Sequence, residues 1–362
     1  LYYSWMDNTM MTSCSSAVVE AHVERLRNKT KQMIGKDRKD TKLKLLNSKR
    51  TSLSPDGIVS LTSSPSSDIK RYVKILESRS RTTEVTLKEL RFILSQGVVY
   101  IDEFFKIPGS LQHLVTYLTC KKPKLQWESA GCLTNLACGS SKQSLKLVRI
   151  CGAYIILFLN SSSTLLQEQC LWAISNLCCD GLKVCSILIK QGLIGSLSSC
   201  LSSCHEHVVT AALNVSILLL HEVNGIIELD FLNHALLKCI KPCNDLQLNH
   251  LICLLYLSTT QYYAEQILES NFVKILDHKP HYVDSDDVST LYIKLLLNIL
   301  INITSYPSIS EKFQLLKGPI INFFSTYSID ETFQEELYKL ACNTSKITDF
   351  QSFKDLFHLF QL

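Results

Sequence analysis

The chain has 362 residues, of which 46% are apolar, with only 12 Gly and 8 Pro and a formal net charge of +4. With this apolar content and few Gly and Pro residues, the chain can bury a large core. No alternation of β-branched residues with hairpin turns is present, so mainly-β and α/β folds are disfavoured.

The positive charge is concentrated at the N terminus. Residues 1–50 contain 11 Lys/Arg and 5 Asp/Glu, a net of +6, which leaves −2 on the other 312 residues. We expect a partly disordered basic arm over 1–50, a Ser/Pro-rich linker over 51–67 and a folded domain over 68–362. The basic residues of interest in the arm are Arg25, Arg27, Lys36, Arg38, Lys39, Lys42, Lys44, Lys49 and Arg50.

Two segments within the folded domain follow the same pattern about 41 residues apart. Residues 125–139 read LQWESAGCLTNLACG and residues 166–180 read LQEQCLWAISNLCCD. A period of about 40 residues is typical of an α-solenoid, in which each unit of short helices buries its apolar face against its neighbours. Steps of this period from Asn135 reach apolar runs of helical length at Leu94, Asn176, Ile217, Ser258, Asn302 and Cys342 or Asn343. The sequence therefore predicts about seven repeats of an all-α solenoid.

A second marker follows the same period. Gly or Asn stands before an apolar run where we expect one helix to end and the next to begin at a steep angle, because these residues accept a positive φ at low cost. The positions are Gly109, Gly152, Gly192, Asn233, Asn271 and Gly318.

Most of the 15 Cys lie inside the predicted helices, where free Cys acts as a small core residue, and this indicates a reducing compartment. The longest apolar run, 208–220, is about 13 residues, shorter than the roughly 20 that span a membrane, so we interpret it as a buried helix. Four zinc-type donors occur at Cys200, Cys204, His205 and His207, but their spacing matches no common zinc motif. We expect no metal and no other cofactor.

The residues around Trp172 resemble a known repeat. Trp172 and Asn176, preceded by Gln169 and followed by Asp180, look like the third-helix motif of an importin-α armadillo repeat. Residues 127–143, with Asn135 and Gly139, resemble the adjoining repeat. The resemblance implies a right-handed armadillo solenoid whose third helices hold an extended Lys/Arg-rich nuclear localisation peptide.

The chemistry of these residues suits such a ligand. Residues four apart share one helix face. The indole of Trp172 can therefore flank a lysine stem and offer a cation–π contact, while the amide of Asn176 can bond peptide backbone and Asp180 can pair with the ammonium. The structural alternative is that Trp172 packs in the core and that the Asn side chains bond neighbouring helices.

The sequence also departs from the importin-α pattern. Importin-α repeats the Trp/Asn pair over most of ten units, whereas here Gly131 stands at the Trp position before Asn135, and Leu213 and Ile217 replace both residues of the next pair. The arm weakly resembles the importin-β-binding segment of that family, which docks on importin-β or folds back into the groove. A solvated or phosphate-attracted tail is the alternative for this arm.

No catalytic motif is present: no phosphate-binding Gly-rich loop, Gly-x-Ser-x-Gly elbow or His-Glu-x-x-His helix. We therefore expect a monomeric, non-enzymatic binding module of the cytoplasm and nucleus, without membrane or specific nucleic-acid binding. Two functions remain. One is a nuclear import adaptor that binds a basic cargo peptide and importin-β. The other is an armadillo scaffold that has lost cargo recognition.

Overall fold

The computed structural model describes residues 64–78, 83–223, 229–239, 248–269, 286–306, 309 and 340. The chain divides into two compact units, one containing the described residues from 64 to 239 and the other those from 248 onward. The predicted basic arm, Asn271, Gly318, Cys342 and Asn343 lie outside the described residues.

The first unit is built of α-helices and one short 3-10 helix, and its described residues contain no strand. Its helices are α2 (Pro65–Glu77), α3 (Thr83–Ser95), α4 (Val98–Lys106), α5 (Ser110–Leu118), α6 (Pro123–Leu136), α7 (Ser141–Leu157), η1 (Phe158–Asn160), α8 (Thr164–Cys178), α9 (Leu182–Lys190), α10 (Leu193–Leu201), α11 (Glu206–Val223) and α12 (Asp230–Cys239).

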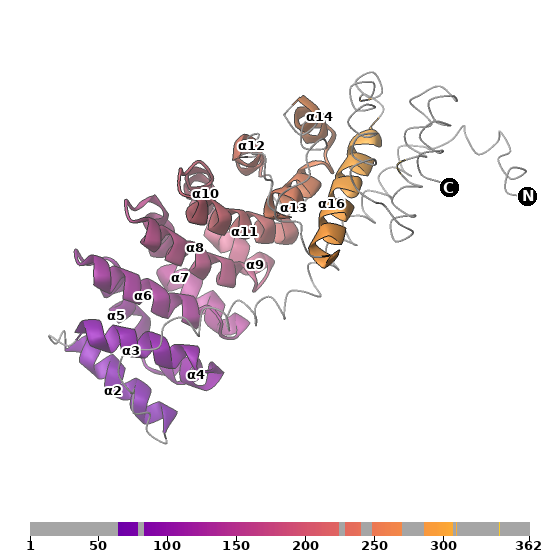
Figure 1. The fold of residues 1–362 in the computed structure, drawn as a ribbon. Helices are drawn as coiled ribbons and strands as arrows, with labels where there is room; N and C mark the ends of the chain where they lie inside the picture. Colours follow the sequence, from indigo (N-terminus) through magenta and orange to yellow (C-terminus); the bar gives the residue numbers. More distant parts are fainter. Residues whose placement is uncertain are drawn as a thin grey trace, which may run out of the picture. The chain divides into compact units, whose positions relative to one another are not determined.

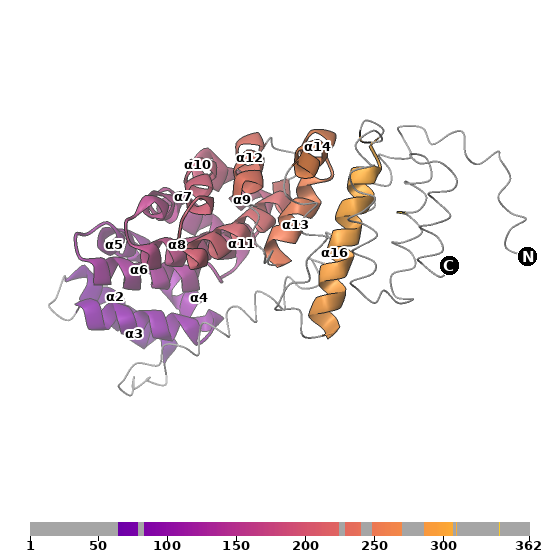
Figure 2. The ribbon, with the colours of Figure 1, turned by 45° about the horizontal axis from the view of Figure 1, so that its top comes forward.

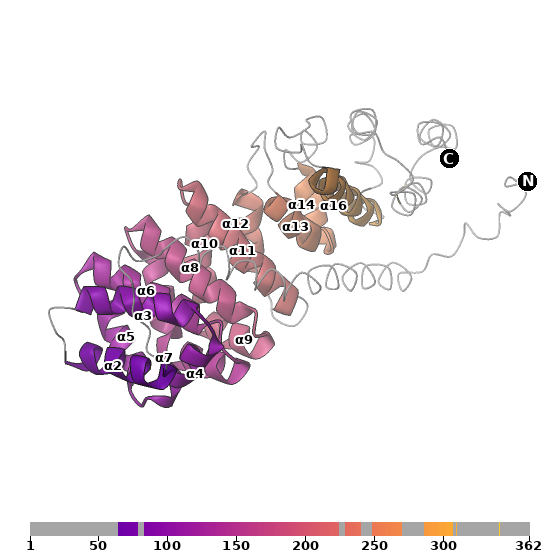
Figure 3. The same cartoon turned by 60° about the horizontal axis from the view of Figure 1, so that its bottom comes forward.

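Helices one period apart pack side by side in this unit. α3 packs on α6, α6 on α8 and α8 on α11, and Figure 1 shows these four helices in succession. We call them the third-helix row. A second row of α5, α7, α10 and α12 runs along it, as Figures 2 and 3 show from two further directions. This arrangement confirms the predicted solenoid.

The apolar composition of the third helices explains their position. Leu133 on α6, Leu171 and Ile174 on α8, and Leu219 on α11 have no exposed surface. Fully burying one such side chain contributes roughly 1.5–3 kcal/mol. Because these helices have neighbours on both sides along the row, residues around most of the helix circumference become buried.

Two of the predicted glycine breaks are confirmed. Gly109 and Gly192 precede α5 and α10 with φ of 78° and 94°, in the left-handed region that favours glycine. Gly152 and Asn233 do not separate helices, because they lie within α7 and α12. At Gly152 the reason for glycine is close approach: an added Cβ would lie 2.3 Å from Oε1 of Gln191.

The start of α2 corrects the expected linker boundary. α2 begins at Pro65, inside the 51–67 segment. Proline suits the first helical position because its missing N–H is not needed there and its φ is already helical. Pro65 is therefore a helix-start residue.

The second unit contains α13 (Leu248–Leu257), α14 (Gln261–Glu269) and α16 (Asp286–Thr304), and α16 packs on both α13 and α14. Asn302, on α16, is 1% exposed, and its Nδ2 donates to Oγ of Ser258 at 2.9 Å. Nδ2 of Asn298 donates to the carbonyl of Lys294 in its own helix at 2.7 Å. At these two positions the amide nitrogen therefore serves the protein's own structure.

The apolar run at 208–220 belongs to a longer helix than expected. α11 has 18 residues, and it and the segment Ser141–Asn160 are long and apolar enough to cross a membrane by length and composition. So is the pair α9 and α10 taken together, although the two are bent by 85°. In the fold α11 packs against α8, α9 and α10, and 56% of its apolar window is buried. Burial inside the helical stack accounts for the hydrophobicity of α11.

The burial of the cysteines leads to a testable prediction. Burial raises the pKa of the Cys132 and Cys170 thiols far above the usual range and that of Cys151 to about 12, whereas Cys204 is exposed. Because the thiolate is the reactive species, we expect iodoacetamide at about pH 8 to label Cys204 in the folded protein. The three buried thiols should be labelled only after denaturation, as mapped by mass spectrometry. Labelling of Cys132 at the rate of Cys204 would contradict this packing.

Candidate functional site

The α8 helix presents one partly accessible stripe along the third-helix row. Leu165 is 63% exposed, and Glu168, Gln169 and Trp172 follow at helical spacing with intermediate exposure. Nε1 of Trp172 donates to Oε1 of Glu168 at 3.2 Å, one helical turn away. The indole is thus only partly buried and is fixed beside a carboxylate, an arrangement that can accept a cation.

Asn176 lies one turn beyond Trp172 and is 8% exposed. Its Nδ2 donates to the carbonyl of Thr134 at 3.1 Å and lies 3.3 Å from Sγ of Cys138. Asn135 makes the same type of contact, since its Nδ2 donates to the carbonyl of Arg91 at 2.8 Å. We expected the side-chain amide of each Asn to bond a peptide backbone through both its N–H and its oxygen. In both cases the N–H group instead donates to the preceding helix of the row.

The other predicted residues also make contacts within the protein. The carboxylate of Asp180 accepts hydrogen bonds from the hydroxyls of Ser141 (3.2 Å) and Ser144 at the start of α7. Nε2 of Gln169 donates to Oγ1 of Thr134 at 2.6 Å. These two side chains link neighbouring repeats.

Gly139 lies in the connection between α6 and α7. Gln143, the partner of Ser140 in the α7 capping box, places its Oε1 2.4 Å from where a Cβ of residue 139 would be. The absence of a side chain at 139 thus leaves room for the α7 cap, which is a structural reason for glycine there.

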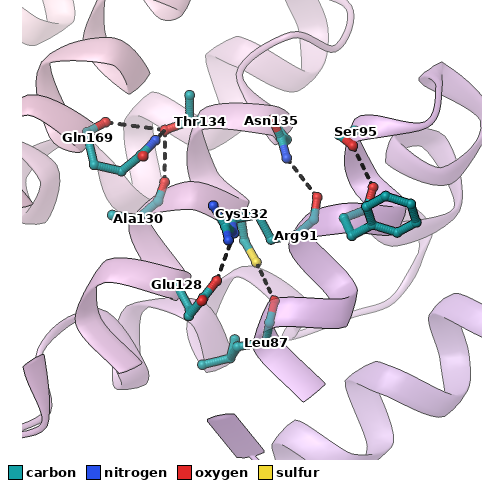
Figure 4. A network of polar contacts seen from close by, with 10 residues as sticks. Leu87, Arg91, Ser95, Glu128, Ala130, Cys132, Thr134, Asn135 and Gln169 are labelled. Atoms are coloured by element: carbon teal, nitrogen blue, oxygen red, sulfur yellow. Dashed lines mark hydrogen bonds and ion pairs between the residues drawn. The ribbon is translucent and has the colours of Figure 1, made fainter. Parts of the chain in front are cut away.

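Arg91 is a site residue that the sequence reasoning missed. It lies on α3, and its side chain is 8% exposed. Figure 4 shows it reaching α6, where its Nε lies 2.7 Å from Oε2 of Glu128. Its guanidinium also lies 4.5 Å from the centre of the Trp127 ring. The Nε–Oε2 contact is poorly aligned for a hydrogen bond and is therefore mainly an ion pair.

The Arg91–Glu128 pair occupies a repeated position in the row. Arg91 and Thr134 make the same contact with the next helix of the row, because their carbonyls accept the amides of Asn135 and Asn176 respectively. Glu128 contacts Arg91. Gln169, 41 residues later, contacts Thr134. One interface of the row therefore uses an Arg–Glu contact where the next uses Thr–Gln. In the sequence, Arg91 is the one charged residue of the apolar run 90–94, and this position could have indicated a buried ion pair.

The environment of Glu128 is unfavourable for charge. Burial raises the pKa of this carboxyl above its usual range, and the positive charge of Arg91 offsets only part of that rise. For this carboxyl, desolvation by burial therefore outweighs the attraction to Arg91.

The four zinc-type donors of residues 200–207 do not form one cluster. Cys200 is buried with its Sγ 3.5 Å from the carbonyl of Leu159, while Cys204 is exposed. The rings of His205 and His207 have centroids 5.8 Å apart. Within the described ranges, no group of three His, Cys, Asp or Glu side chains could hold a metal ion.

Comparison with solved structures assigns the fold. No protein-family model matches the chain. A designed armadillo repeat protein in complex with the peptide (KR)4 is 19% identical, with a TM-score of 0.54 over 64% of this chain and 99% of its own. An engineered protein is 18% identical, with a TM-score of 0.61 over 78% of this chain and 68% of its own. The described helices thus form an armadillo-repeat solenoid.

Curated proteins of known family show which armadillo-type proteins this chain resembles in sequence. The chain is 34% identical over 113 residues to importin subunit alpha-9 of Arabidopsis thaliana and 33% identical over 91 residues to probable importin subunit alpha-A of Dictyostelium discoideum. These matches cover 31% and 25% of this chain but only 22% and 16% of those proteins. The matched part of the chain is thus similar in sequence to importin-α subunits, and the chain spans less than a quarter of their length.

Proposed function

We propose that the chain acts as a nuclear import adaptor, binding a basic peptide of a cargo protein along the third-helix row of α6, α8 and α11. The observation that carries this proposal is the partly exposed indole of Trp172 with the Glu168 carboxylate beside it. An aromatic face next to an anionic oxygen attracts an ammonium or guanidinium group by two independent electrostatic terms.

The comparisons support the class of ligand. Two curated relatives are named as importin α subunits, and a designed armadillo protein of similar fold was solved with the peptide (KR)4. Asp180 and the Oδ1 atoms of Asn135 and Asn176 supply acceptors for a peptide, while their partners within the protein hold them in place.

A titration tests this proposal. A fluorescent Lys-rich peptide is added to the full chain, and a peptide of the same length with Gln in place of every Lys is the control. We expect saturable binding of the Lys peptide that weakens as salt is raised, because charge attraction is screened. Equal binding of the two peptides would contradict the proposal and favour the scaffold function.

The basic arm gives a separate prediction. We propose that residues 1–50 bind importin-β and compete with cargo for the same row, since the arm carries a net charge of +6. Deleting residues 1–50 should abolish the capture of importin-β and raise the affinity for the Lys peptide. Retained capture of importin-β after the deletion would contradict the importin-β role. Unchanged affinity for the Lys peptide would contradict the competition with cargo.

A further inference from the structure

One position in the third-helix row holds a cation supplied by the chain itself. Gly131 on α6 is at the place that corresponds to Trp172 on α8, one period later. A Cβ built on Gly131 would lie 2.3 Å from Cδ of Arg91 and 3.3 Å from its Cγ and Nε. The stem of Arg91 therefore fills the space in which a side chain at residue 131 would begin.

The guanidinium of Arg91 makes the contacts that we expect of a basic side chain from a bound peptide. Its guanidinium lies 4.5 Å from the centre of the Trp127 ring, and its Nε lies 2.7 Å from the Glu128 carboxylate. An aromatic face and an acidic oxygen are also what α8 offers, through Trp172 and Glu168. The two neighbouring helices thus present the same chemistry, and on α6 the cation comes from α3 of the same chain.

We propose that Arg91 is a built-in occupant of the cation subsite on α6, so that the row accepts a peptide's principal basic side chain only at α8, beside Trp172. This inference rests on the proposed function. It makes Arg91 a specificity-determining residue, because a second guest cation at α6 meets a buried positive charge instead of an open anionic pocket.

The occupancy has a physical reason. A Trp–Glu pocket left empty in the row would hold a buried carboxylate without a counter-charge, which is strongly unfavourable. Arg91 satisfies that carboxylate, and its backbone carbonyl also accepts the amide of Asn135 at 2.8 Å. The same residue therefore closes one subsite and ties α3 to α6.

The first test uses the full chain with Arg91→Ala and the small cation N-ethylguanidinium, with neutral N-ethylurea as the control. If the subsite exists, the cation fills the vacated space and should raise the melting temperature of this variant by about 2 °C, at concentrations that leave wild type unchanged. Adding Trp127→Leu to the variant should remove the effect. No selective rise over N-ethylurea, or a rise that persists without Trp127, would overturn the proposal.

Arg91→Gln is the second variant, because it leaves a polar group beside Glu128 if Arg91→Ala lacks a cooperative melt. Methylguanidinium and methylurea then replace the ethyl compounds. A selective rise with methylguanidinium supports the proposal, and its absence overturns it. Recovery of a cooperative melt by the cation alone is also a supporting result.

A peptide experiment separates this inference from the proposed function. Wild type should bind peptides with one Lys and with two Lys within about threefold of each other, whereas Arg91→Ala should prefer the two-Lys peptide by about tenfold, the effect of one new desolvated cation–π contact. Binding by wild type without this gain overturns the inference alone. Absence of peptide binding in both proteins overturns the proposed function, and the small-cation melt still decides the subsite.

Discussion

Replacing Trp172 by alanine is expected to weaken binding of the Lys-rich peptide by about 10- to 100-fold, the usual effect of losing a central aromatic contact. The loss has two sources. The variant removes the aromatic face that flanks the lysine stem, and it frees Oε1 of Glu168 from the indole N–H that orients it at 3.2 Å. The dissociation constants of wild type and variant, measured by fluorescence anisotropy at one salt concentration, give this ratio.

The matched control is Tyr154→Ala. Tyr154 is an aromatic residue that is 42% exposed on α7, in the second row. Its removal should change the affinity less than twofold, because α7 lies outside the proposed binding row. Equal losses in both variants would show that the peptide binds by general charge attraction or elsewhere on the surface. A thermal melt of each variant verifies that the fold is retained.

Replacing Arg91 by methionine is expected to destabilise the first unit by about 3 kcal/mol near neutral pH, the usual cost of leaving one member of a buried ion pair alone. Glu128, whose side chain is 10% exposed, would then be a buried carboxylate without its cation. Urea unfolding followed by circular dichroism measures the difference from wild type.

The pH dependence of this loss has a defined sign. Burial already raises the pKa of Glu128 in the wild-type protein, and removing Arg91 removes the main opposing influence. A carboxyl whose pKa is raised by folding stabilises the folded state most below its unfolded pKa, and this contribution is lost as pH rises through the folded pKa. The deficit of Arg91→Met should therefore shrink as pH falls toward about 4.3, the unfolded value for Glu.

Two controls isolate the pair. The double variant Arg91→Met, Glu128→Gln should recover most of the lost stability, since it leaves no buried charge. Glu84→Gln breaks an exposed ion pair in which the side chain of Glu84 is 54% exposed and that of Lys124 is 80% exposed. This variant should lower the free energy of unfolding by less than about 1 kcal/mol. An Arg91→Met deficit that is independent of pH and unrelieved by Glu128→Gln would contradict the ion-pair account.

The period of the chain was sufficient to predict the fold, because a solenoid repeats its local contacts along the sequence. The pairing of Asn135 and Asn176 one period apart located two adjacent helices of the row, α6 and α8. The positive φ at Gly109 and Gly192 followed from residue type alone. Gly152 did not fit this rule, because its glycine is required by the approach of Gln191, which caps the C-terminal end of α9.

The details of the candidate site were less predictable, because they depend on contacts between repeats. A sequence shows that Asn176 is an amide but not that its Nδ2 reaches the carbonyl of Thr134. The absence of a Trp at residue 131 could be read directly, whereas its replacement by the side chain of Arg91 from 40 residues earlier required the packing of α3 on α6. Long side chains cross repeat boundaries, and the pattern of one repeat does not record them.

The most direct test of the binding row is photo-crosslinking. A Lys-rich peptide with a benzophenone next to its central lysine is bound to the full chain, irradiated, and its attachment sites are mapped by mass spectrometry. The account predicts attachment within α6, α8 or α11 that is lost with Trp172→Ala and with an excess of unlabelled peptide. Attachment confined to the second row, at α5, α7 or α10, and unchanged by Trp172→Ala, would contradict it.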